Sequence, residues 1–212
     1  MEKGILSLNT KGELIIKSQG VREQPVSSDP AVFQGLRAVV YLLVDCSSSM
    51  CGEKIEQVKE GALDFAKTSV RKGYRVGLIS FSDGAFLICE LTADVSSIAR
   101  QINRFIASGT TNLADALRIA SDRLLRRQGY RVVVVATDGC PNDPNLALQI
   151  AGKMKQDKIE ILAISTDDAD QDFLSKLVSR KDLNLKVERN EFRKGMDMMA
   201  SKLPVQSLEY KK

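Results

Sequence analysis

The chain has 212 residues, of which 43% are hydrophobic and 27% charged, and its formal net charge is +4. It contains no histidine, which excludes Ser-His-Asp and Cys-His nucleophilic catalysis and every metal site built on imidazole. Aromatic residues are few (seven Phe, four Tyr, no Trp) and basic residues are interspersed with acidic ones, so we expect no nucleic-acid interface.

Residues 1–35 differ from the remainder and are expected to form an N-terminal β-hairpin followed by a linker. Two short apolar segments, residues 5–8 and 13–17, flank the sequence Asn-Thr-Lys-Gly, which is typical of a hairpin turn. Residues 21–30 are polar and contain two prolines, which favours a linker. Because so short a hairpin buries little apolar surface, we expect it to be a small appendage of the main sheet.

From residue 36 to residue 202, strand and helix patterns alternate. The first strands are expected at residues 38–44, 74–81 and 85–91, the last two joined as a hairpin through Ser-Asp-Gly, and a helix at residues 53–72. Further strands are expected at residues 131–136, 159–165 and 184–187, and further helices at residues 95–106, 112–127, 145–156, 171–178 and 192–202. Residues 203–212 are predicted to be a polar C-terminal tail.

This alternation predicts an α/β domain with a Rossmann-like, doubly wound and mostly parallel sheet. Helices are expected on both faces, and the hairpin strand is expected to be one antiparallel strand at an edge. The runs at residues 38–44 and 131–136 are almost purely apolar, which is typical of strands buried on both faces.

Three segments far apart in the sequence carry side-chain oxygen atoms that suit a hard metal ion. Asp45, Ser47 and Ser49 follow the first buried strand, Thr111 precedes a helix, and Asp138 follows the fourth strand. In the strand order 3-2-1-4-5-6, the first and fourth strands are neighbours, so their carboxyl ends lie together. Carboxylates and hydroxyls are ligands for Mg²⁺ or Mn²⁺ rather than for Zn²⁺ or copper.

Each segment also has an ordinary structural interpretation. Asp45 and the threonines Thr110 and Thr111 can cap the helices that follow them, and Thr137-Asp138-Gly139 can be a simple turn. It is the combination of all three segments at strand and helix ends that favours a metal site.

The set resembles the von Willebrand factor A domain and its metal-ion-dependent adhesion site. The family pattern is Asp-x-Ser-x-Ser, a distant Thr before a helix and a distant Asp after a strand. It is matched here, over about residues 36–202, by Asp45, Ser47, Ser49, Thr111 and Asp138. Thr111 is chosen over Thr110 because the family's ligand precedes the residue that is Asn112 here.

The resemblance implies a metal-dependent protein-interaction module and not an enzyme. In the family, Mg²⁺ keeps one coordination position open for an Asp or Glu carboxylate of a partner protein. The chain length and the loop of residues 45–52 look like those of small tellurite-resistance-associated members. Partners implied by the family are MoxR-type ATPases, chelatase-like motors, kinases or phosphatases, within an ATPase-linked or stress-response assembly. The chain has no Walker A pattern of its own, so it would not be the motor.

The alternative is a Mg²⁺-dependent phosphoryl-transfer enzyme with Asp45 as nucleophile. It is disfavoured because haloacid-dehalogenase-like phosphatases need a second Asp two residues on, where this chain has Ser47. A Rossmann-type nucleotide-binding protein is also disfavoured, since no G-x-G-x-x-G follows the first strand.

Three of the four cysteines, Cys46, Cys51 and Cys140, lie in or next to the candidate metal segments. The simplest interpretation is that they are small buried fillers. A sharper hypothesis is that oxidation of Cys51 and Cys140 draws the loops together and closes the site. Since no segment is typical of a signal peptide or a membrane span, we expect a cytoplasmic protein with reduced thiols and no membrane partner.

Overall fold

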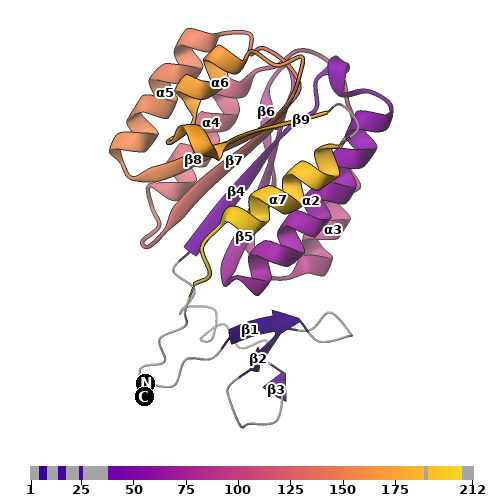
Figure 1. The fold of residues 1–212 in the computed structure, drawn as a ribbon, viewed down its shortest axis with the longest axis vertical. Coiled ribbons are helices and arrows are strands. Elements are labelled where there is room, and N and C mark those ends of the chain that lie inside the picture. Colours follow the sequence, from indigo (N-terminus) through magenta and orange to yellow (C-terminus); the bar gives the residue numbers. More distant parts are fainter. Residues whose placement is uncertain (1–4, 9–13, 18–23, 26–37, 189–190, 207–212) are drawn as a thin grey trace.

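The computed structural model describes residues 5–8, 14–17, 24–25, 38–188 and 191–206. Its main body is a six-stranded sheet covered by helices on both faces (Figure 1). One face carries α4, α5 and α6, and the other carries α2, α3 and α7 (Figure 1). In the described residues, no helix is both long and apolar enough to cross a membrane.

The strands of the main sheet follow the order β6-β5-β4-β7-β8-β9. Their bounds are β4 Ala38–Asp45, β5 Tyr74–Phe81, β6 Ala85–Thr92, β7 Arg131–Thr137, β8 Ile159–Thr166 and β9 Asn184–Val187. All neighbours are parallel except β5 and β6, which are antiparallel. Numbered within this sheet, the order is 3-2-1-4-5-6, and the predicted fold class with one antiparallel edge strand is confirmed.

The two central strands are apolar because helices cover both of their sides. Every residue of β4 is buried, and in β7 only Arg131 is partly exposed. Their register pairs Val44 with Ala136, so Asp45 and Thr137 are the next residues along the two strands. The sheet therefore places the first and third predicted segments side by side at its carboxyl edge, the end at which β4, β5, β7 and β8 finish.

The helices begin and end close to the predicted positions. Their bounds are α2 Glu53–Arg71, α3 Val95–Ile102, α4 Leu113–Leu124, α5 Pro144–Gln156, α6 Gln171–Leu177 and α7 Phe192–Lys202. Short 3₁₀ helices span Ser48–Met50 and Lys181–Leu183. The largest difference is α3, which was predicted to reach residue 106. It ends early because the chain turns to bury Phe105 and then brings Ser108 to the backbone of Cys46.

The N-terminal hairpin is present, with β1 (Ile5–Leu8) antiparallel to β2 (Leu14–Lys17). Within the predicted linker, a short strand, β3 (Gln24–Pro25), pairs with β2 and completes a separate three-stranded sheet. The remaining residues of the predicted hairpin turn and linker lie outside the described residues.

The first residues of the predicted tail contact the main sheet. At the amino edge of the main sheet, where β4, β5 and β7 begin, the Tyr74 hydroxyl donates to the carbonyl of Pro204 at 3.0 Å. The backbone N–H of Gln206 donates to the carbonyl of Lys72 at 2.8 Å. These bonds attach residues 204–206 to the sheet because they satisfy polar groups that β5 and α2 leave at that edge.

Candidate metal centre

The three predicted segments meet at the carboxyl edge of the sheet. The first segment, residues 45–52, is held to the second, residues 107–112, by two backbone hydrogen bonds. Ser48 N–H donates to the carbonyl of Gly109 at 3.0 Å, and Ser108 N–H donates to the carbonyl of Cys46 at 2.7 Å. The third segment, residues 137–142, continues β7 beside β4 and is held to the second segment by the Asn142 N–H, which donates to the carbonyl of Thr111 at 2.9 Å.

Asp45 is completely buried at the end of β4. One carboxylate oxygen accepts from the backbone N–H of Ser47 at 2.8 Å, and the other accepts from the Thr137 hydroxyl at 2.5 Å. Burial raises the pKa of the Asp45 carboxyl, and the hydrogen bonds from Thr137 and Ser47 oppose that rise. A nearby cation would favour the ionised form further, so this carboxylate suits a cation-binding position.

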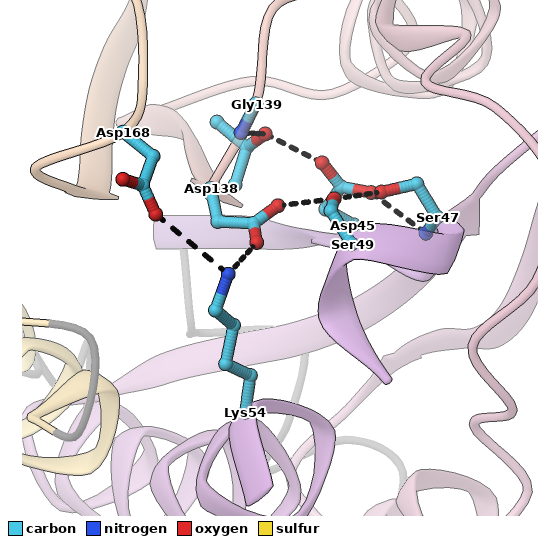
Figure 2. A network of polar contacts seen from close by, with 8 residues as sticks. Asp45, Ser47, Ser49, Lys54, Asp138, Gly139 and Asp168 are labelled. Atoms are coloured by element: carbon cyan, nitrogen blue, oxygen red, sulfur yellow. Dashed lines mark hydrogen bonds and ion pairs between the residues drawn. The ribbon is translucent and has the colours of Figure 1, made fainter. Parts of the chain in front are cut away.

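A chain of hydroxyls links the first segment to Asp138 (Figure 2). The Ser49 hydroxyl donates to one carboxylate oxygen of Asp138 at 2.7 Å, and the hydroxyl oxygens of Ser47 and Ser49 lie 3.0 Å apart. Since Ser49 gives its single hydrogen to Asp138, Ser47 is the donor of the second bond. Four of the five predicted residues are therefore neighbours in one small cluster.

The two threonines of the second segment have different environments. Thr110 donates to the Asp83 carboxylate through both its N–H, at 2.8 Å, and its hydroxyl, at 2.9 Å. These bonds lower the pKa of Asp83. The hydroxyl of Thr110 also accepts from the Asn142 amide at 2.9 Å. The hydrogen bonds of Thr110 therefore hold the loop of residues 107–112 in place.

Thr111 instead places its hydroxyl beside the cluster. A Cβ added to Gly139 would lie 3.8 Å from the Thr111 hydroxyl oxygen and 4.0 Å from that of Ser49. The space next to Gly139 is thus shared by hydroxyls from two segments. The structure thus places the Thr111 hydroxyl near that of Ser49, and Thr111 as a metal ligand stays a prediction.

Lys54 is a member of the cluster that the sequence patterns did not identify. Its ammonium group contacts the second carboxylate oxygen of Asp138 and lies 3.9 Å from a carboxylate oxygen of Asp168 (Figure 2). Its place in the first turn of α2, where a positive charge opposes the helix dipole, does not identify Asp138 as its partner, because Glu53 and Glu56 lie in the same turn.

All four cysteines are free thiols. Cys46 belongs to the hydrophobic core, where burial raises the pKa of its thiol to about 12, so it is an ordinary filler. Cys51 and Cys140 are exposed, and the Cys51 thiol donates to the carbonyl of Ala107 at 3.4 Å. The oxidation hypothesis for these two thiols stays a prediction.

The donor set fits a hard divalent ion. Two carboxylates and three hydroxyls supply only oxygen atoms, the ligand type that Mg²⁺ and Mn²⁺ prefer. Among the residues that the structure describes, no group of three or more His, Cys, Asp or Glu side chains could hold a metal. Any ion held here must therefore rely on the hydroxyls of Ser47, Ser49 and Thr111 as well as on the carboxylates.

Comparisons with solved structures identify the fold. The vWF domain of the type V pili tip protein Mfa5 from Porphyromonas gingivalis has a TM-score of 0.70 at 13% identity, covering 78% of this chain and 94% of that one. The proximal thread matrix protein 1 from the mussel byssus, solved with a zinc-occupied MIDAS motif, has a TM-score of 0.68 at 19% identity, covering 77% and 45%. Manganese-loaded Plasmodium vivax TRAP has a TM-score of 0.62 at 19% identity, covering 78% and 74%.

This chain thus spans less than half the length of the mussel protein. No curated protein matches the sequence. A family model described as the von Willebrand factor type A domain matches residues 40–196, a range that contains all five candidate ligands. The chain belongs to the von Willebrand factor type A domain family.

Proposed function

We propose that this protein is a metal-dependent docking module. Its ligands are the five clustered residues Asp45, Ser47, Ser49, Thr111 and Asp138, and its ion is Mg²⁺ or Mn²⁺. The observation that carries the proposal is the convergence of carboxylate and hydroxyl oxygens from three distant segments at one edge of the sheet. A bound ion would supply positive charge that attracts an Asp or Glu side chain of a partner protein.

The charges of the metal-binding residues explain why the bound ion should attract a carboxylate of a partner protein. Asp45 and Asp138 together offset the charge of a divalent ion, while the hydroxyls add none. An ion with so many neutral ligands stays strongly attractive to a further carboxylate, because hydroxyls reduce its field less than carboxylates do. The zinc and manganese ions named for the mussel protein and for TRAP support a metal-binding role for this fold.

The geometry supports docking over phosphoryl transfer. Asp45 is fully buried, and hydrogen bonds from Ser47 and Thr137 hold its carboxylate at the end of β4, so the group is not presented at the surface to a phosphate ester. Ser47 stands where the general acid–base aspartate of a phosphatase would be, and a serine hydroxyl is a poor proton donor at neutral pH. These features favour a module that binds without catalysing a reaction.

The resemblance to the family suggests the class of partner protein. The partner would be a MoxR-type ATPase, a chelatase-like motor, a kinase or a phosphatase in a cytoplasmic ATPase-linked or stress-response assembly, as for the tellurite-resistance-associated members. Residues 36–202 would form the docking unit, with residues 1–35 and 203–212 as additions to it.

The two threonines provide a test of the proposal. Wild-type protein and the variants Thr111→Val and Thr110→Ser, the second of which keeps the hydroxyl that bonds to Asp83 and Asn142, are immobilised and incubated with cell extract in Mg²⁺, and captured proteins are eluted with EDTA and identified by mass spectrometry. We expect wild type and Thr110→Ser to release the same proteins into EDTA, and Thr111→Val to capture none of them. Capture that survives EDTA, or that is equal for Thr111→Val, would contradict the proposal.

A further inference from the structure

The cluster contains a cation that belongs to the protein itself. Lys54, in the first turn of α2, places its ammonium on the outer carboxylate oxygen of Asp138, while Ser49 binds the inner one (Figure 2). The side chain of Lys54 is 19% exposed and that of Asp138 only 1%, so solvent screens this ion pair weakly.

We propose that Lys54 sets the ion affinity and the ligand preference of the metal centre. It would do so by competing with the divalent ion for Asp138 and by moving toward Asp168 when that ion binds. This inference rests on the proposed function, because it concerns the same candidate ligands.

The competition follows from charge. Without Lys54, the carboxylates Asp45, Asp138 and Asp168 present three negative charges to a divalent ion; with it, the cluster presents two. A second positive centre on the Asp138 carboxylate also repels an incoming cation at short range. Lys54 therefore weakens ion binding as long as its ammonium stays on Asp138.

The same charge has the opposite effect on a partner carboxylate. Once a divalent ion is bound, the ion and Lys54 together offset the three carboxylates Asp45, Asp138 and Asp168, whereas without Lys54 the loaded centre keeps one net negative charge. A neutral centre attracts an anionic side chain more strongly than a negatively charged one does. One residue thus lowers the affinity for the ion and raises the affinity of the loaded centre for its ligand.

Asp168 offers the ammonium a second position. It follows β8 at the carboxyl edge, with a carboxylate oxygen 3.9 Å from the Lys54 nitrogen, and its side chain is 36% exposed. The four-carbon stem of lysine is flexible, so a small side-chain movement carries the charge from Asp138 to Asp168. Asp168 would therefore favour the ion-loaded state by holding Lys54 away from the ligand.

The first experiment measures ion affinity by calorimetric titration of the full chain with Mn²⁺ and with Mg²⁺. Lys54→Met keeps the length of the side chain and removes its charge, and we expect it to bind Mn²⁺ about tenfold more tightly or better. Lys54→Arg, which keeps the charge, should bind like wild type. Lys59→Met is the matched control, because Lys59 lies on the same helix and pairs with Glu56 outside the cluster. Equal or weaker ion binding by Lys54→Met would overturn the inference.

The second experiment tests the role of Asp168 by a double-mutant cycle. Asp168→Asn should weaken Mn²⁺ binding more than Asp167→Asn, which removes the same charge from a neighbouring residue paired with Lys186. In the Lys54→Met background the two Asn variants should become equivalent, because Asp168 acts through Lys54. An unchanged effect of Asp168→Asn in that background would contradict the movement between the two aspartates.

The third experiment uses acetate as the carboxylate probe, followed by the water-proton relaxation of bound Mn²⁺. Acetate should bind the Mn²⁺-loaded Lys54→Met variant several-fold more weakly than the loaded wild type, since the loaded variant carries one more net negative charge. Equal acetate affinity would contradict the second half of the inference. Failure of every protein, variants included, to bind Mn²⁺ would overturn the proposed function itself, whereas Mn²⁺ binding that is insensitive to Lys54 would overturn this inference alone.

Discussion

The two edges of the main sheet bury different kinds of polar group. At the amino edge, the tyrosines Tyr74 and Tyr130 stack edge to face with ring centroids 6.2 Å apart, and Tyr74 bonds to the backbone of Pro204. At the carboxyl edge, Asp45 is buried as a carboxylate and receives hydrogen bonds only from neutral groups of Ser47 and Thr137.

The two kinds of buried polar group differ in what they cost the folded state. A neutral hydroxyl bonded to a backbone carbonyl closes the core at little cost, whereas a buried carboxylate costs free energy unless a cation compensates it. The amino edge therefore contributes to the folded state under all conditions. At the carboxyl edge, Lys54 compensates the charge of Asp138, whereas the buried carboxylate of Asp45 is met only by neutral hydrogen-bond donors.

The largest effect is expected at the amino edge, from Tyr74→Ala. Tyr74 is fully buried, so the cavity and the lost contacts should lower the free energy of unfolding by about 3–5 kcal/mol. The loss, measured by denaturant unfolding, should be equal in Mg²⁺ and in EDTA. A loss that differed between the two conditions would show that the edges are coupled.

The second largest effect is expected at the carboxyl edge, where Mg²⁺ should change the free energy of unfolding. At a Mg²⁺ concentration 100 times its Kd, the ion should stabilise wild-type protein by about 2.7 kcal/mol, and Asp45→Asn should gain none of this. In EDTA, Asp45→Asn should be at least as stable as wild type, because burial raises the pKa of Asp45 and so disfavours its charge. Thermal unfolding with and without EDTA measures both quantities, and a large loss in EDTA would assign Asp45 a structural role.

A smaller effect concerns Asp94, which caps α3 at the amino edge, where Thr92 pairs with Val76. Its carboxylate accepts from the N–H groups of Ser96 and Ser97, so Asp94→Ala should lower the free energy of unfolding by about 1 kcal/mol at neutral pH.

The same cap gives the amino edge a defined pH dependence. Hydrogen bonds from Ser96, chiefly through its hydroxyl, hold the pKa of Asp94 below its ordinary value of 3.8. The folded state therefore binds this proton less readily than the unfolded state, and the stabilisation is complete above pH 3.8 and is lost as the pH falls through the lower, folded-state value. The difference between wild type and Asp94→Ala should shrink in that window, and a constant difference down to pH 2 would contradict it.

Most of the fold could be predicted from local sequence patterns, because strands and helix ends are set by residues close together in the chain. The apolar runs of β4 and β7 can only be buried strands, and the glycine at position 73, with a φ of +89°, ends α2 as expected. The end of α3 could not be predicted, since burial of Phe105 and the bond from Ser108 to Cys46 depend on tertiary packing. The bonds of Gln206 to the sheet also join residues far apart in the chain.

In the candidate site, too, some features could be predicted from the sequence and others depend on tertiary contacts. Asp45 and Asp138 could be placed together because adjacent parallel strands bring their ends together, and the motif added the two serines. The pairing of Lys54 with Asp138 joins residues 84 positions apart and leaves no periodic trace, so only the folded geometry reveals it. The different roles of Thr110 and Thr111 likewise depend on Asp83 and Asn142.

The most direct test of the metal centre is a crystal of the full chain soaked with Mn²⁺ and measured for anomalous scattering. We expect a single strong peak between Asp45, Asp138 and the hydroxyl of Thr111, with the Lys54 ammonium displaced toward Asp168. A peak at another place, or no peak at a Mn²⁺ concentration that saturates binding in solution, would contradict the assignment of this cluster as the metal centre.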